Sequence, residues 1–121
     1  YVKIVQCLND YKVFENGKKI RNNSLFKKNG VNVNFVEQIS ENEFSVRTYE
    51  RGVEDETYSC GTGVTASAII AYQNKWVNAQ DVNISTLGGD LKVSFQHKND
   101  GYENVWLKGP AVRVYKGEIE I

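Results

Sequence analysis

The stretch that most limits how this chain can fold is an uncharged segment that follows a charge-dense loop. No Asp, Glu, Lys or Arg occurs between Glu56 and Lys75, and the residues from Val64 to Tyr72 are small or apolar on nearly every helical face. A helix of this composition is expected to be buried on all sides. Cys60 lies at its start, in the sequence Cys-Gly-Thr-Gly. We therefore predict a central buried helix with a thiol at its N-terminus.

Length and charge narrow the class of protein. A chain of 121 residues, 40% of them hydrophobic, is enough for one domain and too short for two, so we expect a single domain over residues 1–121. Fifteen basic and fifteen acidic residues balance, which disfavours nucleic acid or an anionic membrane as a partner.

Neither a membrane span nor a signal-peptide pattern is evident, so we expect a cytoplasmic protein. The chain begins without Met and directly with a strand pattern, which indicates a domain of a longer protein.

Alternating apolar and polar residues predict strands on both sides of this helix. Before it, strand patterns cover Val2 to Leu8, Val31 to Gln38 and Phe44 to Tyr49. After it, they cover Asn83 to Thr86, Leu91 to Phe95, Tyr102 to Leu107, Ala111 to Tyr115 and Glu118 to Ile121. Cys7 is expected to be a buried core residue, and Trp106 is expected in the core or the wall of a barrel. We infer an α+β domain whose mostly antiparallel, curled and barrel-like sheet wraps around one central helix.

Two asparagines share one face of the strand from Val31 to Gln38. Asn32 and Asn34 lie on the face opposite Phe35, because side chains alternate along a strand. Asparagine is depleted in strands, so this face either meets solvent or lines a polar pocket. In an earlier polar region, bracketed by Asn16-Gly17 and Asn22-Asn23, Lys18-Lys19 and the nearby Lys27-Lys28 are expected to form a solvated face.

Cys60 occupies a position at which cysteine can take part in chemistry. A thiol at a helix N-terminus meets the positive end of the helix dipole and unpaired backbone N–H groups, which favour the thiolate. The N–H groups of Gly61, Thr62 and Gly63 can hold a carboxylate, and the two glycines let a ligand approach the backbone closely. A cysteine beside such an anion site indicates chemistry on a carboxylic acid.

Three reactions could use this cysteine. Acyl transfer needs a general base, normally histidine, and the only histidine, His97, lies in a polar hairpin where a surface role is expected. Thiol redox chemistry needs a second nearby cysteine, and Cys7 belongs to a predicted strand. Neither cysteine has the spacing of a metal ligand, so no metal site is predicted. Proton transfer at a carbon next to a carboxylate can use a thiolate as base and a thiol as acid, placed on opposite faces of that carbon. Only one such group, Cys60, is evident in this sequence.

The strand that ends in Glu50 and Arg51 supplies groups for the far end of a charged ligand. Arg51 can bind a carboxylate through two hydrogen bonds, and Glu50 can accept from an amine. Glu54, Asp55 and Glu56 are expected to be solvated loop charges or partners of the helix dipole. The alternative hypothesis is that Gly-Thr-Gly only starts the helix tightly and that Cys60 is an inert, buried residue.

The combination of these segments resembles the diaminopimelate epimerase family. Glu50-Arg51-Gly52, followed by the residues from Glu56 to Gly63, is similar to the signature around the second catalytic cysteine of that family. Further matches occur in the family's order at Gly30 to Val36, Leu87 to Leu91, Leu107 to Ala111 and Gly117 to Ile119. Cys-Gly-Thr-Gly alone also resembles proline racemases, but its combination with Glu-Arg-Gly upstream is specific.

The resemblance implies the C-terminal half of a two-domain, pyridoxal-independent isomerase. Such an enzyme interconverts LL- and meso-diaminopimelate in lysine and cell-wall precursor synthesis. By resemblance, Cys60 is one of two acid/base cysteines, and Gly61 and Thr62 hold the α-carboxylate through backbone N–H groups. Asn32, Glu50 and Arg51 recognise the distal end of the substrate. The implied partners are diaminopimelate and the N-terminal domain of the same enzyme, with a homodimer as one option for its assembly; no cofactor is implied.

The chain departs from the family pattern at two places. The family usually has Glu-Arg-Gly-x-Gly-Glu-Thr, whereas the segment from Val53 to Thr57 is one residue longer and lacks the second glycine, which leaves the path of this loop open. The partner cysteine belongs to the N-terminal half, and Cys7 does not lie in its motif, so the chain alone is not expected to epimerise. The rival functions are another two-cysteine racemase or isomerase of the same fold, similar to proline racemase, and a non-catalytic ligand-binding domain.

Overall fold

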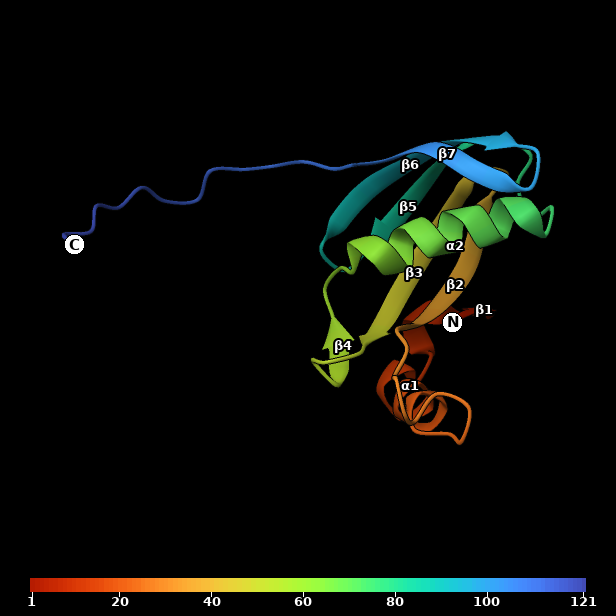
Figure 1. The fold of residues 1–121 in the computed structure, drawn as a ribbon, viewed down its shortest axis with the longest axis horizontal. Helices are drawn as coiled ribbons and strands as arrows, with labels where there is room; N and C mark the ends of the chain where they lie inside the picture. The colour runs from red at the N-terminus through yellow and green to blue at the C-terminus, as the bar shows by residue number, and fades with distance from the viewer.

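The computed structural model describes residues 1–121, which form a seven-stranded sheet with a helix packed on each face (Figure 1). The elements follow in the order β1 (Val2–Ile4), the short 3-10 helix η1 (Leu8–Asp10), α1 (Val13–Arg21), β2 (Val33–Ser40), β3 (Glu43–Glu50), β4 (Asp55–Thr57), α2 (Gly61–Gln73), β5 (Asp81–Thr86), β6 (Gly89–Lys98) and β7 (Gly101–Lys108). The predicted α+β class is confirmed. None of these helices combines the length and the apolar character needed to cross a lipid bilayer.

The sheet is mixed, with mostly antiparallel pairs, as predicted. Its strands lie in the order β1-β2-β3-β5-β6-β7, and β4 pairs with the end of β3. The pairs β1–β2 and β3–β5 are parallel, and the other pairs are antiparallel. The loop whose path the sequence left open turns back after β3, so that Asp55 pairs with Glu50 and Thr57 with Thr48.

The sheet buries a separate hydrophobic core on each face, because β2 and β3 send alternate side chains to opposite sides. The core under α2 contains Val36, Phe44, Val46, Val64, Ala68, Ala71, Val77, Val82, Ile84, Val93 and Phe95. The core under α1 and η1 contains Leu8, Val13, Val33, Phe35 and Tyr49. Strands β2 and β3 are therefore the layer that both helices share.

Helix α2 confirms the predicted helix after Cys60, but its predicted burial on all sides is wrong. The buried residues of α2 are Gly63, Val64, Ser67, Ala68 and Ala71. Thr62 and Gln73 are exposed, and the other residues of the helix are only partly covered. The sheet covers one face of the helix, so the uncharged composition of the opposite face is not explained by burial within this chain.

The N-terminal turn of α2 lies directly against polar side chains of the sheet. Asn34, which is 1% exposed, accepts the hydroxyl of Thr48 at 2.8 Å and donates to the carbonyl of Tyr1 at 3.0 Å. A Cβ added at Gly63 would collide with Oδ1 of Asn34 and lie 3.3 Å from Oγ1 of Thr48. The asparagine face of β2 is thus covered by α2 at Asn34, and Gly63 allows α2 to pack closely on the sheet.

Helix α1 lies in the region that the sequence predicts to be a polar, solvated face. Gly17, in the middle of this helix, is buried, and a Cβ added there would collide with the side chain of Tyr49. The Asn16-Gly17 pair therefore lies inside a helix that packs on the sheet. Its glycine lets the helix pack closely on β3, while Lys18 and Lys19 are exposed, as predicted.

The prediction of Cys7 as a buried strand residue is wrong. Strand β1 ends at Ile4, and Cys7 is exposed, with a φ of 53°, as the N-cap residue of η1. The carboxylate of Glu37 accepts the backbone N–H groups of Cys7 at 3.1 Å and Leu8 at 2.9 Å. The backbone N–H groups of Cys7 and Leu8 thus donate to a side chain and not to the backbone of a neighbouring strand, so the strand pairing does not continue to Cys7.

Two predictions near the C-terminal end are also wrong. Trp106 is 70% exposed, because β7 is the last strand of the sheet and neither helix covers this residue. Residues 109–121 extend away from the sheet without regular secondary structure (Figure 1), so the segments 111–115 and 118–121 are not strands in this structure. An alternating sequence needs a paired neighbour to form a strand, and no strand of the chain pairs with these residues.

The contact between α2 and the sheet can be tested by filling the space at Gly63. We expect Gly63→Ala to destabilise the fold by about 1–3 kcal/mol, the usual cost of overpacking an interior, since two hydrogen bonds hold Asn34 in place. Urea unfolding followed by circular dichroism measures the change. Gly101→Ala is the matched control, because nothing lies within 4 Å of its added Cβ. Equal unfolding midpoints for the two variants would contradict the packing described here.

Candidate active site

Cys60 is the N-cap residue of α2, with an extended backbone and a side chain that does not cap the helix. It is 6% exposed, and its carbonyl accepts the N–H of Val64 at 2.9 Å. The N–H groups of Gly61, Thr62 and Gly63 come before this first intrahelical bond, so they have no acceptor within the helix. The thiol thus lies beside free donors and the positive end of the helix dipole.

Asn32 connects this thiol to the loop that carries Arg51. Its Nδ2 donates to Sγ of Cys60 and to Oγ1 of Thr62, each at 3.4 Å. Its Oδ1 accepts the backbone N–H of Arg51 at 2.8 Å. The family resemblance assigns Asn32 to the distal end of a substrate, and in the structure Asn32 contacts both the thiol of Cys60 and the backbone of Arg51.

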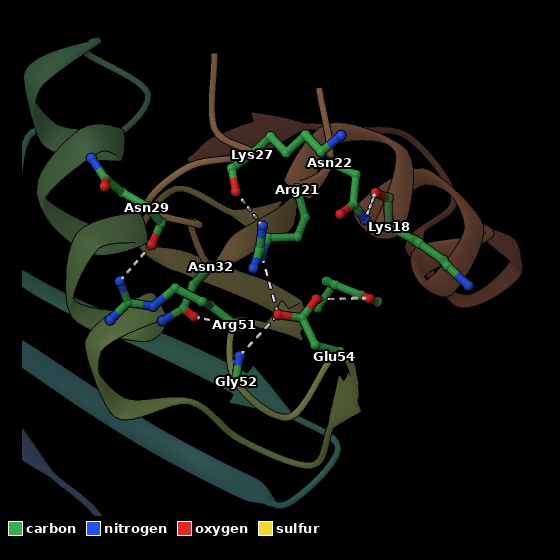
Figure 2. Close-up of polar contacts among 10 residues, drawn as sticks. Lys18, Arg21, Asn22, Lys27, Asn29, Asn32, Arg51, Gly52 and Glu54 are labelled. Carbon is green, nitrogen blue, oxygen red and sulfur yellow. Dashed lines mark hydrogen bonds and ion pairs between the residues drawn. The ribbon is translucent and has the colours of Figure 1, made fainter. Parts of the chain in front are cut away.

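Arg51 follows β3 and is exposed. Its Nη1 donates to the carbonyl of Asn29 at 3.1 Å, and its guanidinium forms no ion pair with a carboxylate of the chain (Figure 2). An exposed guanidinium of this kind retains donors for an acidic group from outside the chain.

Glu50 ends β3 on the same face of the sheet as Asn32. Asn34 pairs with Thr48, and alternation along each strand places Asn32 and Glu50 on the face that α2 covers. The carboxylate of Glu50 accepts the hydroxyl of Thr57 at 2.7 Å. The structure therefore brings the predicted site residues to one region, at the ends of β2 and β3 and the start of α2, and adds Thr57, which the sequence analysis does not single out.

The prediction that Glu56 is a solvated charge is wrong. Its two carboxylate oxygens accept Nε and Nη2 of Arg47 at 2.6 and 2.8 Å, and this hydrogen-bonded pairing raises the pKa of Arg47. Nη1 of Arg47 also donates to the carbonyls of Leu8, Asn9 and Tyr11. Arg47 therefore fastens β4 and the η1 segment to β3.

Glu54 is exposed, as predicted for a loop charge, but it also forms specific contacts within the chain. Its Oε1 accepts Nε of Arg21 at 3.1 Å and the N–H of Gly52 at 3.2 Å, and its Oε2 accepts the hydroxyl of Tyr49 at 3.3 Å. The N–H of Gly52, together with Arg21, holds the pKa of Glu54 below its usual value. Burial, and then the charge of Glu54, raises the pKa of Tyr49. Arg21 lies 33 positions from Glu54, so no local pattern reveals the pair.

A groove runs along the outer face of α2 beside Cys60, lined by Gly61, Thr62, Thr65, Ala66, Ile69 and Leu107. His97 is not part of this region. Its ring lies 5.7 Å, between centroids, from that of Tyr72 in the last turn of α2, roughly 18 Å along the helix from Cys60. The exposed position predicted for His97 is confirmed, and His97 cannot serve as a base for Cys60.

The contact between Asn32 and Cys60 can be tested by the reactivity of the thiol. We expect Asn32→Asp to slow alkylation of Cys60 by iodoacetamide at pH 7 about tenfold or more, because a second negative charge near 4 Å opposes the thiolate by several kcal/mol. Mass spectrometry of the Cys60 peptide measures the rate, and exposed Cys7 is the internal control. A ratio of Cys60 to Cys7 alkylation rates that stays the same in the variant would contradict the contact.

Comparison with known sequences places the chain in one family. A statistical model of the family described as diaminopimelate epimerase matches residues 2–114. The diaminopimelate epimerase of Flavobacterium psychrophilum is 45% identical over 119 residues, which cover 98% of this chain and 46% of that protein. The diaminopimelate epimerase of Aquifex aeolicus is 39% identical over 120 residues, which cover 98% of this chain and 42% of that protein. The chain thus spans less than half the length of these relatives.

Solved structures share the fold at low sequence identity. A phenazine biosynthesis protein of the PhzF family from Enterococcus faecalis has a TM-score of 0.59 and 17% identity, covering 84% of this chain and 34% of that chain. A PhzF-family protein from Bacillus anthracis has a TM-score of 0.59 and 16% identity, covering 83% of this chain and 31% of that chain. These two likenesses concern the fold alone. The sequence match over residues 2–114 is more specific, and it shows that the chain belongs to the diaminopimelate epimerase family.

Proposed function

We propose that this chain is the C-terminal half of a diaminopimelate epimerase, a cytoplasmic enzyme of lysine and cell-wall precursor synthesis. The observation that carries the proposal is the position of Asn32, which donates to the thiol of Cys60 and accepts the N–H of Arg51. One side chain thereby joins a thiol at a helix N-terminus to an arginine that has no acidic partner in the chain. An amino acid with charged groups at both of its ends fits this arrangement.

At the near end of the substrate, Cys60 and the start of α2 act on neighbouring groups. The α-carboxylate accepts the N–H groups of Gly61 and Thr62, where the helix dipole favours negative charge. The thiolate of Cys60 takes the α-proton, and the electron pair left on the carbon is delocalised into that carboxylate. A thiol on the opposite face then gives its proton to the carbon and inverts the configuration. In the reverse direction the two sulfur atoms exchange roles.

At the far end, Arg51 and Glu50 supply opposite charges. The guanidinium of Arg51 binds the distal carboxylate, and the carboxylate of Glu50 accepts from the distal ammonium. Asn32 lies between Arg51 and the thiol of Cys60. The distance that it spans therefore limits the length of the ligand between its two charged ends. These charges favour diaminopimelate over proline, which has no distal charged groups to bind.

The second acid/base group comes, in this proposal, from the N-terminal half of the enzyme. Cys7 is poorly placed for that role, because Leu8 next to it packs in the core under α1, whereas Cys60 begins the helix on the opposite face of the sheet. The groove beside Cys60, with Ala66, Ile69 and Leu107 along it, offers a surface for the N-terminal half. Contact with that half would also explain the uncharged outer face of α2.

The roles of the two cysteines can be separated in the full-length enzyme. We expect Cys60→Ser to lower kcat by about 10²–10⁴-fold, the usual contribution of a positioned acid/base group, and Cys7→Ser to leave kcat unchanged. The isolated 121-residue chain is expected to produce no meso isomer from LL-diaminopimelate. Chiral chromatography measures the conversion. Full activity of the Cys60→Ser enzyme, or conversion by the isolated chain, would overturn the proposed mechanism.

Arg51 tests the assignment of the substrate. In the full-length enzyme, Arg51→Ala is expected to raise KM for diaminopimelate about tenfold or more, since hydrogen bonds to charged groups contribute roughly 1.5–3 kcal/mol. Lys92→Ala, which removes an exposed cation on β6, is the matched control and should leave KM unchanged. If Arg51→Ala also leaves KM unchanged, a substrate without a distal carboxylate becomes the better assignment.

A further inference from the structure

A cluster of polar contacts lies next to Arg51, on the side toward α1 (Figure 2). Its centre is the carboxylate of Glu54, which accepts Nε of Arg21 and the N–H of Gly52 on the same oxygen. Gly52 directly follows Arg51, so the contact fixes the backbone next to the arginine. Arg21 is the last residue of α1, and the pair therefore joins that helix to the turn after β3.

The turn itself folds so that this contact can form. Gly52 has a φ of 91° and Glu54 a φ of 60°, both in the left-handed region. The N–H of Glu54 donates to the carbonyl of Glu50 at 2.8 Å, which closes the turn. Residues 51–55 are all exposed, so no hydrophobic burial holds them. Their geometry depends on these hydrogen bonds and on the ion pair with Arg21.

The same arginine also contacts the loop between α1 and β2. Nη1 of Arg21 donates to the carbonyl of Lys27, and Nη1 of Arg51 donates to the carbonyl of Asn29 (Figure 2). Gly30 lies between the two arginine side chains. A Cβ added there would lie 2.6 Å from Cδ of Arg51 and 3.0 Å from Cζ of Arg21. This loop leads directly to Asn32. Contacts of Arg21, Glu54 and Arg51 therefore hold both the turn after β3 and the loop before Asn32.

The pairing of charges in the cluster leaves Arg51 without an acidic partner. Glu54 forms its ion pair with Arg21, and Arg51 forms none within the chain. Arg47 and Glu56 already fasten β4 through a separate, two-pronged pair. Because Arg47 and Glu56 already hold β4, the Arg21–Glu54 pair is not needed for that purpose. Its further contact is with the turn that carries Arg51, through the N–H of Gly52.

We propose that Arg21 and Glu54 are positioning residues, which hold the Arg51 turn and the Asn32 loop in the geometry that receives the distal carboxylate of the substrate. This inference rests on the proposed function. Neither residue contacts the substrate. Glu54 neutralises Arg21 and anchors the N–H of Gly52, which leaves the guanidinium of Arg51 unpaired and correctly placed for an incoming acid.

The first test needs no substrate. In the full-length enzyme, Arg21→Gln and Glu54→Gln are each expected to speed tryptic cleavage after Arg51, because the released turn fits a protease more readily. Arg21→Lys keeps the charge and should stay close to the unsubstituted rate. Glu103→Gln breaks another exposed ion pair, with Lys98, and is the matched control. Mass spectrometry of the fragments measures the rates, and equal cleavage after Arg51 in all five proteins would overturn the inference.

The second test measures the effect on the substrate. Arg21→Gln and Glu54→Gln should each raise KM for diaminopimelate about two- to fivefold, the range expected for a partly exposed ion pair, with kcat unchanged. The double variant should be no worse than the weaker-binding single variant, because the two residues act together. A purely structural pair would lower the melting temperature and leave KM unchanged, and that result would overturn the inference. An unsubstituted enzyme that does not epimerise would overturn the proposed function instead, and tryptic cleavage would still decide whether the pair holds the turn.

Discussion

Everything at the candidate site depends on the close approach of two helices to the same pair of strands. Thr48 and Tyr49 are neighbours on β3 and point to opposite faces of the sheet. A glycine of α2, Gly63, packs against Thr48 and the buried Asn34, and a glycine of α1, Gly17, packs against Tyr49. Because glycine has no side chain, each helix backbone can lie directly on the strands. How closely α2 packs on the sheet determines where its N-terminus lies. It therefore also determines where Cys60 lies relative to the ends of β2 and β3.

The parts of this arrangement that follow from local chemistry were predictable from the sequence. Period-two alternation predicts β3, β5, β6 and β7 with shifted ends, although it also predicts two strands beyond β7 that do not form, and the uncharged segment predicts α2 itself. Cys60 at the helix start and Glu50-Arg51 at the end of a strand are also local features, so their proximity to one another could be inferred once the family resemblance was recognised. The link through Asn32 was only partly foreseen, because a strand pattern gives the face of a side chain but not the two groups that it contacts.

The remaining features depend on partners that are distant in the sequence. Asn16-Gly17 has the composition of a turn, and only the packing on Tyr49 explains why this glycine lies inside a helix. Cys7 leaves its strand because Glu37, 30 residues away, accepts its N–H. The ion pair of Arg21 with Glu54 likewise joins α1 to a loop in which the chain departs from the usual family signature. Local propensity carries no information about such contacts, so it predicts neither the ion pair of Glu56 with Arg47 nor that of Glu54 with Arg21.

The central claim is that Cys60 acts on one face of the α-carbon and a group outside this chain acts on the other. Solvent isotope incorporation tests it most directly. The full-length enzyme is allowed a small extent of conversion of LL-diaminopimelate in deuterium oxide, and the α-hydrogen content of product and recovered substrate is measured by mass spectrometry. The account predicts that the inverted centre of the product carries solvent deuterium, because the proton comes from a second group equilibrated with solvent, while the recovered substrate retains its hydrogen. A product that retains the hydrogen of the substrate would contradict the account, because one group would then have removed and returned the same proton.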